Sequence, residues 1–160
     1  MDRFGTDLIQ RKGIFMYKTL LLPLLLAAAP AAADWSYDPA PLPAGQAIGP
    51  GTNGFSVMVE CANGGLPAVV FRGYDPGASE EIFVVEVDNY GEVLVGADCS
   101  AASCLLAFDT MEEAESFVSG MQYGSNLMVG LYRRGTLSEV PLRGSSAAID
   151  RVLARDCSFM

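Results

Sequence analysis

Hydrophobic and polar residues alternate along several short stretches of the chain, a pattern typical of half-buried β-strands. In residues 55–61, the apolar side chains of Phe55, Val57, Val59 and Cys61 share one face. Turn sequences rich in Gly, Asn and Asp separate these stretches and favour antiparallel pairing. The pattern predicts strands at 55–61, 66–71, 82–87, 92–96, 104–108, 127–131 and 137–142.

Two stretches follow the helical period instead. Thr110 and Glu113 have the spacing of a capping box at the start of the first helix. Ser145 is expected to cap the second helix. The apolar face of the first helix would be formed by Ala114, Phe117, Val118 and Met121, and that of the second by Ile149, Val152, Leu153 and Cys157.

Together these elements predict a β-rich α+β fold. We expect about seven short antiparallel strands, in one sheet or a small sandwich, with two helices packed on it. Residues 55–160 would form this single domain. Residues 34–54 contain four prolines and four glycines and are expected to form an extended arm without regular structure. Trp35 and Tyr37 in this arm would either pack on the domain or be exposed to bind a partner.

Residues 1–33 have the features of a secretory leader. Lys18 precedes an apolar stretch over residues 20–33, which ends in Ala31-Ala32-Ala33. This stretch is shorter than the roughly 20 residues that a transmembrane helix needs, so no integral membrane segment is expected in the mature chain. We expect translation to start at Met16, with a long n-region from Met1 and a buried core helix as alternatives. The protein would then be periplasmic or secreted.

The four cysteines, Cys61, Cys99, Cys104 and Cys157, all follow this leader. An even number in an exported chain favours two disulfides, for which three pairings are possible. Cys99 and Cys104 are close enough in sequence to close a hairpin tip, which leaves Cys61 to pair with Cys157. A redox or metal site is the alternative, but the spacing is not C-x-x-C.

Composition excludes several function classes. The chain has no histidine, so it lacks Ser-His-Asp and Cys-His nucleophile pairs. Cleavage after Ala33 would leave six arginines, no lysine and 17 acidic residues, a net charge of −11. This charge argues against a nucleic-acid partner and favours a basic protein partner. We therefore expect no catalytic residues, no cofactor and no enzymatic activity.

Few residues stand out as candidates for a site. Arg133 and Arg134 form the only basic doublet after the leader and would lie at a hairpin tip, where they could orient a partner. The acidic turn from Asp88 to Glu92 is a weak candidate for a calcium loop, because it lacks the alternating Asp and Asn ligands. No spacing of carboxylates specifies a glycosidase.

The order of features resembles a family of small exported proteins of Gram-negative bacteria, the periplasmic accessory proteins associated with type VI secretion. The likeness extends loosely from Phe55 to Cys157. It is carried by F-S-V-M-V-E-C, V-D-N-Y-G, L-M-V-G-L-Y and P-L-R-G-S-S-A-A-I-D-R-V-L, followed by the last cysteine. The resemblance implies a non-enzymatic envelope protein and transfers only Cys61 and Cys157. The Cys99 and Cys104 tip lies outside that pattern.

Two functions follow as expectations. The first is an exported interaction or accessory module of the cell envelope, which acts without catalysis. The alternative is an inhibitor of a basic secreted enzyme, such as a lysozyme or a protease, whose encounter with the acidic chain would be accelerated by charge.

Overall fold

The computed structural model describes residues 34–61, 65–155 and 157. Within them, one antiparallel sheet of nine strands is covered by two helices, so the expected β-rich α+β class is confirmed. The strands are β1 (Ser36–Asp38), β2 (Gln46–Pro50), β3 (Ser56–Cys61), β4 (Pro67–Arg72), β5 (Glu80–Val87), β6 (Gly91–Ser100), β7 (Ser103–Ala107), β8 (Asn126–Leu131) and β9 (Gly135–Pro141). The helices are α1 (Met111–Tyr123) and α2 (Ser145–Leu153). Neither helix, nor any other in this part of the chain, is long and apolar enough to cross a membrane.

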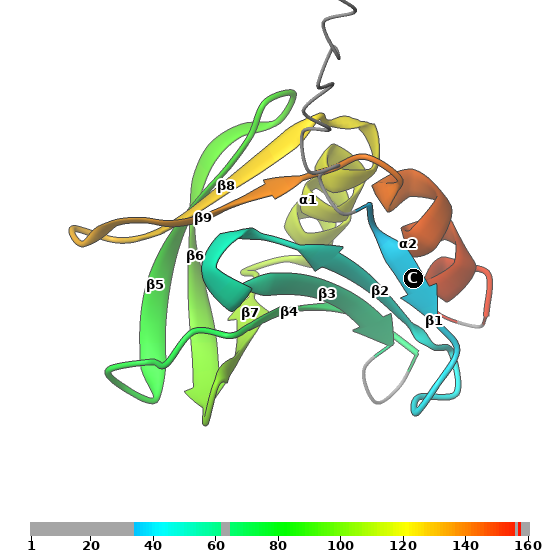
Figure 1. Cartoon of the computed structure of the whole chain (residues 1–160), viewed down its shortest axis with the longest axis horizontal. Helices are drawn as coiled ribbons and strands as arrows, with labels where there is room; N and C mark the ends of the chain where they lie inside the picture. The colour runs from blue at the N-terminus through cyan, green and yellow to red at the C-terminus, as the bar shows by residue number, and fades with distance from the viewer. Residues whose placement is uncertain (1–33, 62–64, 156, 158–160) are drawn as a thin grey trace, which may run out of the picture. The chain divides into compact units, whose positions relative to one another are not determined.

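The sheet is strongly curved. Its strand order is β1-β2-β3-β4-β7-β6-β5-β8-β9, which places the N-terminal strands at one edge and β9 at the other. Curvature brings β9 back into contact with β2 (Figure 1). There, the backbone N–H of Thr52 donates a hydrogen bond to the Ser138 hydroxyl at 2.9 Å. The two ends of the sheet are therefore linked, and the space between them is filled by side chains.

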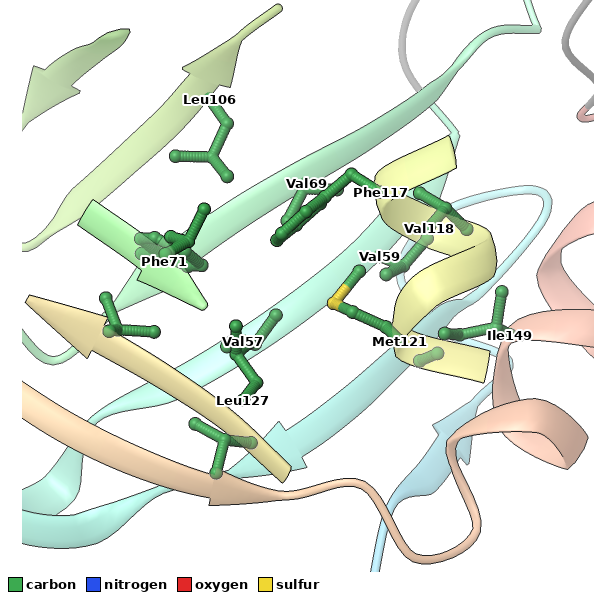
Figure 2. Close-up of a cluster of buried hydrophobic side chains, with 14 of the residues drawn as sticks. Val57, Val59, Val69, Phe71, Leu106, Phe117, Val118, Met121, Leu127 and Ile149 are labelled. Carbon is green, nitrogen blue, oxygen red and sulfur yellow. The ribbon is translucent and has the colours of Figure 1, made fainter. Parts of the chain in front are cut away.

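One continuous core lies on the inner face of this curve. Phe71 forms the centre of an aromatic row, with ring centroids 5.3 Å from Phe55 and 5.1 Å from Phe83. Figure 2 shows Phe117 and Met121 of α1 lying over the strands. Each large side chain buried in this way contributes roughly 1.5–3 kcal/mol. The apolar face predicted for α1 is confirmed, since all four of its residues are buried: Ala114, Phe117, Val118 and Met121.

The prediction of an unstructured arm at 34–54 was wrong. This segment forms β1 and β2, which raises the strand number from about seven to nine. The prolines that suggested an arm lie in the connection between the strands or, like Pro50, at a strand end. Ala47 and Gly49 are buried on β2, but such small side chains produce no visible hydrophobic alternation.

Gly49 is needed because Trp35 packs directly on it. A Cβ at position 49 would overlap three atoms of the indole ring. The same indole N–H donates a hydrogen bond to the Pro141 carbonyl at 3.0 Å, and the Trp35 backbone N–H donates to the Arg143 carbonyl at 3.1 Å. Trp35 thus fixes the first edge of the sheet to the segment that follows β9.

The two helices begin differently. At α1 the Thr110 hydroxyl accepts the Glu113 backbone N–H at 3.1 Å, as the capping box predicts, while the Glu113 carboxylate accepts the N–H of Asp109. Ser145 is not the cap of α2, because Gly144 occupies that position with a φ of 84°. The buried Ser145 hydroxyl instead donates to the Met121 carbonyl at 2.7 Å. This bond joins the start of α2 to α1 and satisfies a buried hydroxyl.

Both predicted disulfides are present. Cys61 at the end of β3 is bonded to Cys157, and Cys99 of β6 is bonded to Cys104, its direct neighbour on β7. Cys157 was expected on the face of the last helix, but α2 ends at Leu153 and Cys157 follows it. The first bond closes a loop with a sequence separation of 96 residues. In the chain-entropy model such a loop stabilises the fold by about 4–5 kcal/mol.

Substitution of Gly49 by Ala tests the packing of Trp35. The added methyl group must displace the indole, so we expect the free energy of unfolding to fall by about 3 kcal/mol. Gly96→Ala is the matched control, because this strand glycine has open space where its Cβ would lie. Urea unfolding of both variants measures the difference. Equal stability of Gly49→Ala and Gly96→Ala would contradict the described contact.

Candidate binding surface

The face of the sheet that points away from the core carries exposed apolar side chains in its centre. We call Ile82 and Val84 of β5, Leu94 of β6, Met128 of β8 and Tyr132 just after β8 the outer patch. Ile82 is 49% exposed and Leu94 is 54% exposed, although both belong to interior strands. Isolated apolar residues on a surface are ordinary, but neighbouring ones often mark a site of interaction.

Strand alternation and register explain how these residues meet. In β5, Phe83, Val85 and Val87 point into the core, so the residues between them point outward. Val84 lies directly opposite Leu94 on one side and Gly130 on the other. Ile82 lies opposite Gly96. Because neither glycine has a side chain, the surface next to Ile82 and Val84 is recessed.

Two hollows flank the outer patch on the same face of the sheet. One, of about 290 Å³, is lined by Val84, Met128 and Gly130, with Arg133 at its margin. The other, of about 350 Å³, is lined by Ile82, Gly96 and Ala107. The outer patch therefore lies between two depressions. This shape suits the side chains of a protein partner better than it suits a small ligand, which binds in a pocket that encloses most of its surface.

Carboxylates line both hollows beside the outer patch. Glu86 and Glu92 line the first hollow, and Glu80 and Asp98 line the second. Glu86 and Glu92 also face each other directly across β5 and β6. Like charges in direct register destabilise a sheet, so this pair does not serve the stability of the fold. An acidic rim of this kind is suited to recognise basic groups.

Of the aromatic residues that the sequence singled out, Trp35 is packed. Its side chain is 6% exposed, so the indole is not available to a partner. Tyr37 is half-buried, and its hydroxyl donates to the Ala44 carbonyl at 3.0 Å. The guanidinium groups of Arg151 and Arg155 lie 5.8 Å and 6.0 Å from the centre of its ring. Tyr37 therefore braces the edge of the sheet against α2.

The basic doublet lies at the β8–β9 turn, as expected, but its two residues have different surroundings. Arg134 forms an ion pair with Glu81 at 3.6 Å. Arg133 lies over the ring of Tyr132, 4.9 Å from its centre, and lines the margin of the first hollow. Only Arg133 is therefore placed beside the outer patch.

The acidic turn considered for calcium uses its first carboxylate within the fold. Asp88 accepts the backbone N–H of Ser125 with both oxygens, at 2.9 Å and 3.2 Å. These bonds hold the pKa of Asp88 below its usual range. Across residues 34–61, 65–155 and 157, no group of three or more cysteine, aspartate or glutamate side chains is close enough together to hold a metal ion.

The outer patch was missed by the sequence analysis, although a signal was present. Residues 82–87 read Ile-Phe-Val-Val-Glu-Val, which is apolar on both faces of the strand. Such a run usually indicates a strand covered on both sides. Here the described structure covers only the inner face of β5, so Ile82 and Val84 become surface residues.

Comparison with known proteins shows a likeness to a solved structure. No family model and no curated protein sequence matches the chain. Among solved structures, the crystal structure of invasion associated protein B from Bartonella henselae is similar, with a TM-score of 0.43 and 19% sequence identity. The aligned part covers 62% of this chain and 73% of that chain. These comparisons contain no support for the expected relationship to type VI secretion proteins.

The bonds of Asp88 predict a pH dependence of stability. Because its pKa in the folded state is depressed, the contribution of this carboxylate is complete above the unfolded pKa of about 3.9 and is lost as pH falls through the lower folded value. Asp88→Asn should therefore lose less stability than the wild type as the pH falls below about 4. Urea unfolding across this range measures it, with Asp75→Asn as the control for net charge. Parallel curves for the wild type and Asp88→Asn would contradict the assignment.

Proposed function

We propose that this protein is a non-catalytic, exported binding module that holds a basic protein partner against the outer patch. The observation that carries the proposal is the combination of exposed apolar residues with a rim of carboxylates on one sheet face. The two disulfides indicate an extracytoplasmic protein, because such bonds are rare in reducing compartments. The secretory leader expected at residues 1–33 lies outside the described residues.

The apolar part of the surface would supply the affinity. Ile82, Leu94 and Tyr132 are each more than two-fifths exposed, and burying them against a partner removes apolar area from water. The centres of protein interfaces are depleted in charge and rich in apolar and aromatic residues, with polar groups at the rim. The outer patch and its carboxylates have this arrangement.

The acidic rim would orient the partner and raise the rate of association. Negative charge lies on both sides of the outer patch, from the carboxylates of Glu80, Glu86, Glu92 and Asp98. After cleavage at Ala33, the whole chain would add a net charge of −11. Such charge raises the rate of encounter with a basic protein and is screened by salt. It also disfavours self-association, because two copies would bring their carboxylates together.

The scaffold would limit the entropy that binding costs. β5 and β6 pair over eight residues, and β5 also pairs with β8, so the central strands of the surface are held from both sides. The Cys99–Cys104 bond closes the far end of the β6–β7 hairpin. A surface that is already ordered before binding loses less freedom when a partner docks.

Inhibition of a basic secreted enzyme is the second candidate function. The acidic rim favours it, since a basic lysozyme or protease presents the complementary charge. An inhibitor would reduce the enzyme's activity at equal molar ratio, whereas an accessory module of the envelope would bind its partner without that effect. The envelope role remains our first proposal because it does not require a target enzyme from another organism.

The proposal is tested by removing the apolar centre of the outer patch. Chains covering residues 34–160 with both disulfides formed would be immobilised and exposed to the envelope fraction of the source organism, and separately to a basic lysozyme. We expect Ile82→Ser combined with Leu94→Ser to weaken binding of the partner at least tenfold, by loss of buried apolar area. Met111→Ser is the matched control, because Met111 is 39% exposed but lies on α1.

The dependence of binding on salt concentration separates the contribution of the acidic rim from that of the apolar residues. The association rate should fall steeply between low and moderate salt if the rim steers encounter. Binding that is equal for the wild type, the double variant and Met111→Ser would show that the outer patch is not the site. Absence of any partner at low salt, in both the envelope fraction and the lysozyme sample, would overturn the proposed function itself.

A further inference from the structure

A third hollow, of about 390 Å³, lies between the β5–β6 turn and the middle of α1. Tyr90 from the turn and Tyr123 at the end of the helix line it. Its other lining residues are Asn89, Glu115, Ser116, Ser119 and Gly120. It shares no residue with the outer patch, and its size is within the range of small-molecule sites.

The polar side chains that line this hollow are not used in hydrogen bonds among the described residues. Asn89, Glu115, Ser116 and Ser119 make no side-chain hydrogen bond with another described residue. Together with the two tyrosine hydroxyls, they offer an amide, a carboxylate and four hydroxyl groups. These groups include both donors and acceptors, and all face one depression.

The two aromatic rings differ in how firmly they are held. Tyr90 packs edge-on against the buried Phe117, with ring centroids 6.1 Å apart. Gly120 lets the ring approach the helix, since a Cβ there would lie 3.1 Å from the Tyr90 Cβ. A glycine inside a helix lowers its stability by about 1 kcal/mol relative to alanine, so the close approach of Tyr90 is accompanied by a less stable α1. Tyr123 is 76% exposed and projects freely.

The geometry points to a binding site for a neutral oligosaccharide. A sugar ring has an apolar face of C–H groups, which packs on aromatic rings, and a border of hydroxyls that both donate and accept hydrogen bonds. Tyr90 and Tyr123 would provide the aromatic surfaces, and Asn89, Ser116 and Ser119 the polar contacts. This site is independent of the proposed protein-binding function and lies on different side chains.

The charge of the lining selects the ligand class. Glu115 is the only charged residue among the described residues of the hollow. With no arginine present, the hollow has no group to pair with a phosphate or carboxylate ligand. A purely apolar ligand would leave the hydroxyl and amide groups without partners, at a cost for each group. An uncharged ligand with many hydroxyls satisfies both conditions.

The test uses amide chemical shifts of the disulfide-bonded chain, residues 34–160, titrated with tri-N-acetylchitotriose and with maltotriose. We expect at least one saccharide to shift amides at 89–90, 115–120 and 123 at millimolar concentration. Tyr123→Ala should weaken binding about tenfold by removing one aromatic surface. Tyr123 is largely exposed, so this variant keeps the fold. Tyr132→Ala is the matched control from the outer patch and should leave saccharide binding unchanged.

Three results would overturn the inference. The first is the absence of shifts with both saccharides, and the second is a set of shifts that is the same in Tyr123→Ala as in the wild type. The third concerns charge: Glu115→Gln removes the negative charge and replaces one acceptor oxygen with an NH₂ donor. A fall in saccharide affinity of more than tenfold in Glu115→Gln would show that recognition depends on the charged carboxylate, in place of the neutral contacts proposed.

Discussion

The contact of the Trp35 indole with Gly49 is the interaction on which the arrangement of the sheet depends. It fixes β1 to β2, and its N–H reaches the Pro141 carbonyl, which is 106 positions away in the sequence. The first and last strands of a nine-stranded sheet are thereby linked. Without such a link, ordering the edge strands would cost conformational entropy with little burial in return.

The Cys61–Cys157 bond and the Thr52–Ser138 hydrogen bonds act in the same region of the fold. One ties the end of β3 to the chain after α2, and the other joins the turn after β2 to β9. Curvature maintained from both edges encloses a single core on the inner face and leaves the outer face of β5, β6 and β8 without cover among the described residues. The surface proposed for binding is therefore a consequence of how the sheet is linked at its ends.

Much of this fold could be predicted from the sequence because its signals are local. Alternation in 55–61 and 127–131, the Thr110 cap and the short Cys99–Cys104 spacing all concern residues close together in the chain. The N-terminal strands could not be predicted, because β2 relies on Gly49 to receive a distant indole and carries no apolar alternation. Ser145 was misassigned for the same reason, since its partner, Met121, lies on another helix.

The binding surface was harder to predict than the fold. Alternation in β5 shows which side chains share a face, but it does not show which face remains in contact with water. That depends on where the helices pack, and α1 and α2 both lie away from the outer face of β5. The opposition of Glu86 and Glu92 follows only from the register of β5 and β6.

This pair of carboxylates allows the most direct test of the account, which holds that the rim is retained for recognition and not for stability. The measurement is the free energy of unfolding and the association rate of Glu86→Gln combined with Glu92→Gln, using the partner that the wild-type chain captures. The account predicts opposite changes: the variant is more stable, because the repulsion is removed, and binds more slowly, with a weaker dependence on salt. A variant that is less stable, or that associates at the wild-type rate, would contradict it.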